Sequence, residues 1–398
     1  MAVGALLLFA AHAATDSTTF STSPLSGVIT GDASPVLDSS AIGGKAVEFG
    51  TGTGSDKFVT VSGTQLILNG QPFRFIGFNL ASITGICLGP NTPNWTTTQM
   101  DTYFSGLPAN GVSRVFAVQT ISPSYITSIV NEATKYQQHL IIVLGDDDSY
   151  CNDTDGAPNG EGSGKTLAYY QSGWKNDYLK WINQIVPPLA NNTTIAMWEI
   201  ANEPFLVGAT FSQVGLSTAQ AYINGAAAAI RADDPNHLVT IGAASVDAMG
   251  GAADYQTLFS KLDVLDFHDY SWVSQNGAVI ANDFATVKQI AQTLDKPFMV
   301  DEAGTAGGTG CTTSTPNPAT FDTSSNVAGL SLTARVTYLV TNKANDYLSS
   351  TSVGGAGGAS GIAFWDYTLA GQSDGPCSLE IQPSDPMVSA VKNYMLPN

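Results

Sequence analysis

The amino-acid sequence predicts an α/β fold, a (β/α)8 TIM barrel, and three observations lead to this expectation. Eight apolar segments rich in β-branched residues follow one another along the chain, and patterns typical of helices separate them. Near-continuous apolar segments are typical of parallel strands buried on both faces, and eight such strand–helix units close into a barrel. No Gly-rich phosphate loop follows the first segment, which disfavours a doubly wound sheet. The predicted strands are 73–80, 112–118, 140–145, 194–200, 238–242, 264–268, 298–301 and 361–365.

The chain before the barrel has a different composition. Residues 3–11 are apolar and lead into Ala11-His12-Ala13, a pattern typical of a signal peptide and its cleavage site, although no Lys or Arg precedes it. We expect a signal peptide over residues 1–13 and a secreted protein, extracellular or periplasmic, with no membrane association in its mature form; a buried N-terminal helix is the alternative. Residues 14–54 are rich in Ser, Thr and Gly and predict a linker or N-terminal extension, with one strand of uncertain attachment in 43–52.

The barrel domain is expected over residues 55–398, and it begins with a β-hairpin. Residues 58–80 alternate between apolar and polar side chains on both sides of Asn69-Gly70. An Asn-Gly pair between two such runs is the strongest short sequence signal for a hairpin. The hairpin leads directly into the first barrel strand.

Charge and cysteine content exclude several classes of partner. The formal net charge is −18, from 33 acidic and 15 basic residues, so nucleic acids and anionic membranes would be repelled. The four cysteines have no CxxC spacing and no nearby His pairs, so we expect two disulfides and no metal or other cofactor. Three connectivities are possible at this point. The expected oligomeric state is a monomer.

Two glutamates lie where two predicted strands end. Glu203 follows the fourth strand and Glu302 the seventh, and they are 99 residues apart (302 − 203). Three βα units take roughly 90 to 100 residues, so both should lie at the C-terminal rim, where catalytic groups of this fold are found. Cleavage of a glycosidic bond needs two facing carboxyl groups, about 5 to 5.5 Å apart when the anomeric configuration is retained. We therefore expect Glu203 to be a protonated acid/base and Glu302 an ionised nucleophile.

The segment Trp198-Glu199-Ile200-Ala201-Asn202-Glu203-Pro204 resembles the acid/base motif of glycoside hydrolase family five. The resemblance extends from about residue 58 to the C-terminus. It implies that Glu203 is the acid/base, that Asn202 hydrogen-bonds the sugar 2-hydroxyl, and that Glu302 is the nucleophile.

Other residues near strand ends match the same family. The resemblance implies that Arg114 hydrogen-bonds the nucleophile and keeps its pKa low, that His268 and Tyr270 position the two carboxylates, and that Trp365 forms an aromatic floor under the sugar. Taken alone, Arg114 could neutralise another barrel carboxylate, and His268 and Trp365 could be core residues. Glu199 and Asp301 are interpreted as structural, because strand alternation turns each away from its catalytic neighbour.

The loops at this rim are expected to form the substrate cleft. Family members often carry a His after strand three, where this chain has Asp146-Asp147-Asp148; the triplet could bind a cation or sugar hydroxyls, and we interpret it as a solvated loop. All four cysteines fall in these loops. We pair Cys311 with Cys377, because the strands before them are neighbours, and Cys87 with Cys151. Candidate sugar platforms are Trp95, Phe205 and Trp272, with Tyr150 and Tyr367, whereas Trp174 and Trp181 are expected in the core.

These expectations describe a retaining endo-β-glycanase that hydrolyses a neutral β-linked polysaccharide, either β-mannan or β-glucan. Residues 194–204 are similar to the mannanase branch of the family, although that branch usually continues with Arg where this chain has Phe205. Residues 265–271 look more like the cellulase-type branch, and we favour mannan. An exo-acting β-glycosidase or transglycosylase would share these residues, and a carbohydrate-binding barrel without catalysis is the alternative from a different class.

Overall fold

The computed structural model describes residues 58–88, 92–108, 110–148, 151, 164–270, 282–308, 311, 330–349, 358–372 and 375–396, together with two strands nearer the N-terminus. The chain forms two compact units, Met1–Lys57 and Phe58–Asn398. In the first unit, β1 (Ala33–Leu37) pairs antiparallel with β2 (Lys45–Phe49), and β2 lies in the segment for which the sequence predicts a strand. The predicted signal peptide lies outside the described residues.

The second unit begins with a small antiparallel sheet of β3 (Thr60–Ser62), β4 (Gln65–Leu68) and β5 (Gln71–Pro72). Between β4 and β5, Asn69 and Gly70 both have positive φ angles, 53° and 74°. This is the conformation that a two-residue type I′ hairpin turn requires, and Asn-Gly adopts it at low cost. The predicted hairpin is therefore confirmed.

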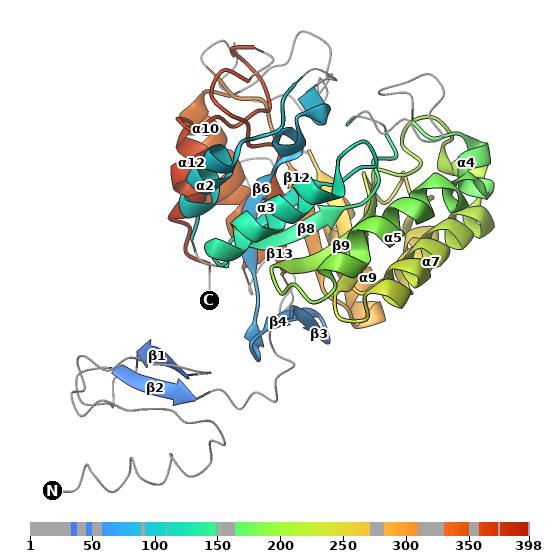
Figure 1. The fold of residues 1–398 in the computed structure, drawn as a ribbon, viewed down its shortest axis with the longest axis horizontal. Coiled ribbons are helices and arrows are strands. Elements are labelled where there is room, and N and C mark those ends of the chain that lie inside the picture. The colour runs from blue at the N-terminus through green and yellow to red at the C-terminus, as the bar shows by residue number, and fades with distance from the viewer. Residues whose placement is uncertain are drawn as a thin grey trace, which may run out of the picture. The chain divides into compact units, whose positions relative to one another are not determined.

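Eight parallel strands form the central sheet, in the order β10-β9-β8-β7-β6-β13-β12-β11 (Figure 1). The two end strands meet as well, because the Asp263 amide donates to the Val239 carbonyl (2.9 Å) and the His268 amide to the Ala243 carbonyl (2.8 Å). The barrel predicted from the sequence is confirmed, strand for strand. The strands are β6 (Phe75–Asn79), β7 (Val112–Phe116), β8 (His139–Val143), β9 (Ile195–Asn202), β10 (Leu238–Gly242), β11 (Leu265–Asp269), β12 (Phe298–Ala303) and β13 (Gly361–Phe364).

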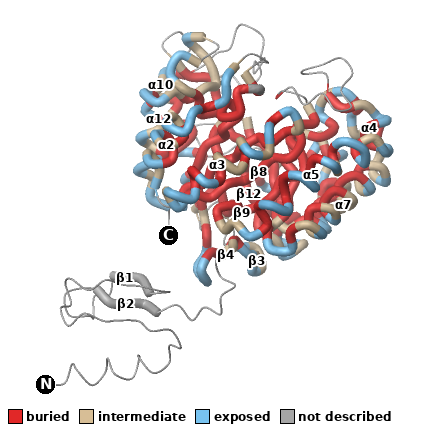
Figure 2. Tube along the Cα trace, in the orientation of Figure 1, coloured by how far each residue is buried: buried red, intermediate tan, exposed pale blue. Residues whose placement is uncertain are grey.

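Helices surround the strands and bury one face each, as Figure 2 shows for α3, α5 and α7. In α3, Ser122 caps the N-terminus, Pro123 occupies the first turn, and buried Ile126, Val130 and Ala133 recur every three or four residues. No described helix is both long and apolar enough to cross a bilayer. The principal helices are α2 (Thr97–Ser105), α3 (Pro123–Lys135), α4 (Leu167–Gln171), α5 (Asp177–Leu189), α6 (Phe211–Val214), α7 (Leu216–Asp233), α8 (Ala252–Phe259), α9 (Asn282–Leu294), α10 (Leu332–Val336), the π-helix η5 (Thr337–Ala344), α11 (Asn345–Leu348) and α12 (Pro386–Lys392).

The two ends of the barrel are closed differently. At the N-terminal end, an apolar cluster joins the β3–β5 sheet to the first residues of the barrel strands. At the C-terminal end, two disulfides, Cys87–Cys151 and Cys311–Cys377, tie loops together. Both predicted pairings are confirmed, and the loops that carry them follow β6, β8, β12 and β13. The apolar cluster contains Val59, Leu66, Leu68, Phe73, Phe75, Val112, Ile141, Ala196, Met197, Val264 and Met299.

Candidate active site

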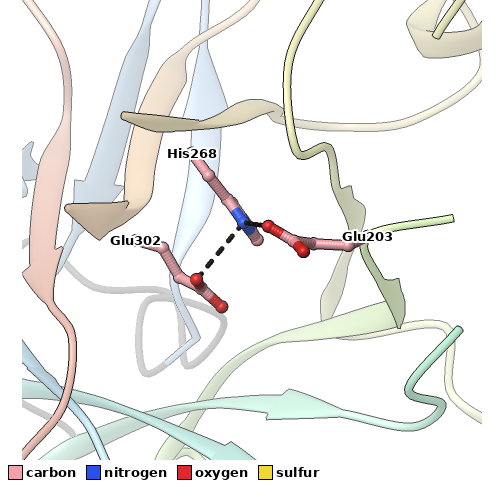
Figure 3. A group of neighbouring side chains, drawn as sticks. All are labelled: Glu203, His268 and Glu302. Atoms are coloured by element: carbon pink, nitrogen blue, oxygen red, sulfur yellow. Dashed lines mark hydrogen bonds and ion pairs between the residues drawn. The ribbon is translucent and has the colours of Figure 1, made fainter. Parts of the chain in front are cut away.

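Glu203 and Glu302 face each other at the C-terminal rim, as predicted (Figure 3). One carboxylate oxygen of each glutamate and a ring nitrogen of His268 all lie within 4.8 Å of one another. His268 Nδ1 lies 2.6 Å from Glu203 Oε1 and 3.3 Å from Glu302 Oε2. The imidazole therefore lies between the two carboxylates and contacts both.

The chain leaves β9 through an unusual backbone conformation at Glu203. Its φ angle is +46°, a left-handed value that non-glycine residues adopt rarely and that is enriched at functional sites. The Glu203 amide still donates to the Gly242 carbonyl on β10 (2.9 Å). The Glu203 side chain is 14% exposed and that of Glu302 only 4%, so Glu203 is the more accessible of the two carboxylates.

Arg114 is fully buried and contacts several polar side chains at the centre of the barrel. Its Nη1 donates to Glu302 Oε1 (2.5 Å), which confirms the predicted contact with this carboxylate. Its Nε and Nη2 also bind both oxygens of Glu199 (2.7 and 2.5 Å). A Cβ at position 242 would collide with Glu199 Oε1 and come within 3.0 Å of Arg114 Nη2, so glycine there provides the room for this ion pair.

Burial and charge act against each other on these groups. Burial disfavours the Arg114 cation, but the carboxylates of Asp301, Glu199 and Glu302 raise its pKa well above the usual value. Burial raises the pKa of Glu302 above 4.5 and outweighs the lowering by His268 and Arg114. Arg114 lowers the pKa of Glu302, as expected, but the loss of hydration of a fully buried carboxylate is the larger effect, so the pKa of Glu302 stays above its usual value.

His268 is held by carboxylates on two sides. Its Nε2 lies 3.2 Å from Asp301 Oδ1, opposite the nitrogen that contacts Glu203. Burial disfavours the imidazolium, yet the charges of Glu302 and Glu203 raise the pKa of His268 well above 6.5. Tyr270 donates its hydroxyl hydrogen to Glu302 Oε2 (2.7 Å), and burial raises the pKa of Tyr270, so it remains a donor. These contacts match the predicted positions of His268 and Tyr270.

Asn202 connects this centre to the loop after β8. Its Oδ1 accepts a hydrogen bond from Arg114 Nη2 (2.7 Å), and its Nδ2 donates to Asp146 Oδ1 (3.0 Å). Asp146 and Asp147 are both fully buried, and the Tyr222 hydroxyl donates to Asp147 (3.1 Å). The interpretation of the acidic triplet as a solvated loop is therefore wrong for its first two members.

The structure corrects the predicted aromatic platforms. Trp95 and Phe205 are each only 2% exposed, because Trp95 packs against Tyr103 and Tyr367, and Phe205 packs against aromatic rings of the core. Neither can present a free ring face to a sugar, and Tyr367 is buried as well. Trp365 is half-buried beside Phe116, with ring centroids 5.8 Å apart, and remains a candidate. Trp272 and Tyr150 lie outside the described residues, and Trp174 and Trp181 are buried as predicted.

Three contributors to the site were not named from the sequence: Asn79, Gly242 and Asp266. Asn79 ends β6, accepts from Arg114 Nη1 (2.9 Å) and donates to the Asp301 carbonyl (2.7 Å). Asp266 Oδ1 accepts from the Asp301 amide (3.1 Å). Asn79 and Asp266 are polar residues within predicted barrel strands, and this signal could have identified them.

Two groups of described side chains bring carboxylate and imidazole atoms close enough to hold a metal ion. They are Glu203, His268 and Glu302, and Asp266, His268 and Asp301. Both groups depend on His268, whose nitrogens already contact carboxylates in each direction. The absence of a metal cofactor stays a prediction.

Comparison with known proteins identifies a matching family model and a curated relative. Residues 69–333 match the family model described as Cellulase (glycosyl hydrolase family 5). The chain is 24% identical over 254 residues to mannan endo-1,4-beta-mannosidase A of Hypocrea jecorina, a match that covers 55% of this chain and 56% of that protein. The chain thus spans little more than half the length of this curated relative.

Solved structures share the fold at low identity. The endo-1,4-beta-mannanase from Rhizomucor miehei superposes with a TM-score of 0.55 at 19% identity, over 84% of this chain and 97% of that one. The endo-1,4-beta-mannanase from Eisenia fetida gives 0.53 at 17% identity, over 85% and 96%. At such identities the likeness supports the barrel fold alone.

Proposed function

Because the chain belongs to glycosyl hydrolase family 5, the cellulase family, we propose that it is a glycoside hydrolase that cleaves a neutral β-linked polysaccharide with retention of configuration. The observation that carries this proposal is the approach of Glu203 and Glu302 at the C-terminal rim, with an oxygen of each within 4.8 Å. Retaining enzymes place the two carboxyl groups about 5 to 5.5 Å apart, whereas inverting enzymes leave about 6.5 to 9.5 Å for a water molecule.

The proposed reaction is a double displacement. Glu203, the more accessible carboxyl group, donates its proton to the departing glycosidic oxygen while a Glu302 oxygen attacks the anomeric carbon and forms a glycosyl ester. Glu203 then accepts a proton from water, which attacks the same carbon and releases the sugar from Glu302.

The environment of Glu302 favours this first step. Arg114 and Tyr270 hold its two oxygens separately. Burial makes the ionised carboxylate costly, as its raised pKa indicates, and formation of the ester removes that charge. Because the charged carboxylate is already unfavourable in the free enzyme, the free-energy barrier from the free carboxylate to the transition state of attack is lower.

We propose that the substrate is β-mannan and that the enzyme cleaves internal bonds of this polysaccharide. The support is the curated relative, a mannan endo-1,4-beta-mannosidase, together with the sequence motif around Glu203. The net charge of −18 disfavours anionic glycans. The two disulfides support the proposal of secretion, since such bonds persist in oxidising compartments.

The test is a panel of mannan, glucomannan, carboxymethylcellulose, mixed-linkage β-glucan and xylan, with sizing of the products and NMR identification of the first anomer released. We expect mannan to be cleaved internally with the β-anomer formed first. Glu302→Ala should lower the rate on the order of 10⁴-fold, and azide should partly restore it on an activated aryl glycoside, as a β-to-α inverted glycosyl azide. Cleavage of none of the five glycans, or full activity in Glu302→Ala, would refute the proposal.

A further inference from the structure

The acidic loop after β8 is connected to the candidate active site by a short series of hydrogen bonds. Asp146 accepts from Asn202 Nδ2 through Oδ1 (3.0 Å) and from the Cys151 amide through Oδ2. Cys151 is in turn bonded to Cys87, which lies in the loop after β6. We propose that Asp146 is a positioning residue that fixes the amide of Asn202 for a substrate hydroxyl, and that the Cys87–Cys151 disulfide keeps Asp146 in place.

The two partners of Asn202 specify which way its amide faces. Arg114 has only donors to offer, so the Asn202 atom that meets its Nη2 at 2.7 Å must be Oδ1. An ionised Asp146 has only acceptors, so the atom that meets Oδ1 of Asp146 must be Nδ2. Each partner excludes the flipped amide, and together they fix both ends of the side chain.

This orientation leaves one hydrogen of Asn202 available. An Asn NH2 group carries two hydrogens that it can donate. Among the described residues, Asp146 is the only protein acceptor of a hydrogen bond from Asn202 Nδ2. Asn202 and Glu302 are both bonded to the guanidinium of Arg114, so the amide lies beside the proposed nucleophile. The substrate hydroxyl next to the attacked anomeric carbon is the one on C2, and it is the acceptor that this hydrogen would meet.

The disulfide acts on Asp146 through the backbone. The Asp147 amide donates to the Asn202 carbonyl (2.9 Å), and the Asn202 amide donates to the Gly145 carbonyl (2.8 Å), so the loop continues the β8–β9 pairing up to Asp147. Beyond this pairing, the Cys151 amide donates to Oδ2 of Asp146, and Cys151 is itself tied to the loop after β6 by its bond to Cys87. Loss of the disulfide should weaken the contact between the Cys151 amide and Asp146.

This inference rests on the proposed glycosidase function, and the experiment separates the two. It uses the whole chain, an activated aryl β-glycoside of a mannose disaccharide, and the analogue that lacks the C2 hydroxyl on the sugar bonded to the aryl group. Asp146→Asn keeps the size of the side chain but places an NH2 group against Asn202 or against the Cys151 amide. We expect kcat/KM to fall about 10-fold on the hydroxylated substrate, mainly in kcat, and to change little on the deoxy analogue.

Matched variants distinguish positioning from general disturbance. Asp148→Asn removes the same charge from the same loop and should leave the ratio of the two kcat/KM values unchanged. The Cys87→Ser/Cys151→Ser double variant should lower that ratio, whereas Cys311→Ser/Cys377→Ser should not. If Asp146→Asn fails to fold, the ratio of the two kcat/KM values in the two double variants still tests whether the disulfide acts on Asn202 through Asp146.

The possible failures point to different conclusions. If the wild type cleaves neither substrate, the proposed function is wrong. If the wild type cleaves both, and Asp146→Asn or the Cys87→Ser/Cys151→Ser variant slows both equally, the function stands and the positioning role of Asp146 is overturned.

Discussion

The two ends of the barrel are built from the same strands but have opposite chemistry. On β7, Val112 belongs to the apolar cluster at the N-terminal end, and Arg114, two residues later, lies in the polar centre. On β9, Met197 and Glu199 show the same change over the same interval. Residues two apart on a strand point to the same side, so these strands change from apolar to charged within the barrel interior. Val264, directly before β11, with Asp266 on β11, and Met299 with Asp301 on β12, repeat the pattern.

We expect the apolar end of the barrel to contribute to stability and the charged end to catalysis. Apolar side chains at the N-terminal end gain free energy by leaving water, and they have no polar groups to satisfy. The charged side chains lose hydration when buried, and burial raises the pKa of Glu199 and of Asp266 well above their usual values. A buried ion cluster is weak evidence for stability, so we attribute its presence to the reaction. Substitutions at the two ends should therefore affect different measurements.

The largest effect is expected at the charged end, for Glu203→Ala. Removal of a general acid typically costs about 10²- to 10⁴-fold in rate. The loss should appear on polysaccharide and on aryl glycosides with poor leaving groups, because only these need a proton at the departing oxygen. Rates of the first chemical step, measured with a series of aryl glycosides of graded leaving-group pKa, test this. An equal loss across the series would contradict the acid role of Glu203.

At the apolar end, Met197→Ala should affect stability and leave catalysis intact. Met197 is fully buried, and truncation of a buried Met to Ala costs about 2 to 5 kcal/mol in the free energy of unfolding. Urea unfolding measures that loss, and kcat/KM per folded molecule should stay within about twofold of the wild type. A large fall in kcat/KM for the folded variant would mean that the two ends are not independent.

The sequence was sufficient to predict the barrel and the carboxylate pair, because both follow from regular spacing. Apolar strands at intervals of one βα unit define the fold, and residues that end strands meet at one rim. The contacts of Arg114 and His268 with the carboxylates could also be predicted, because the resemblance to the family assigns both residues to the site. Asn79 and Asp266 were missed because they are polar residues within predicted strands, whereas the regular spacing marks residues that follow strand ends.

The loops were less predictable for a physical reason. Trp95 and Phe205 follow strands, as a sugar platform would, yet both are buried against other aromatic rings. Strand periodicity gives no information on which face of a loop residue is covered by later segments of the chain. The same limit applies to Asp146, whose burial depends on Asn202 and on a disulfide partner, Cys87, that lies 64 residues from Cys151 in the sequence.

The smallest expected effect is a change of pH dependence at the charged end. In the proposed mechanism Glu302 must be ionised to attack, so kcat/KM on an activated aryl glycoside should fall as the pH drops through its pKa. Burial raises that pKa, and the acid limb should therefore have its midpoint above pH 4.5. His268→Gln removes a nearby positive charge that lowers the pKa of Glu302, and should therefore move the midpoint upward. Asp177→Asn, on an exposed surface pair with Lys180, serves as the control and should leave it in place. A downward shift in His268→Gln, or none, would mean that the limb reports a group other than Glu302.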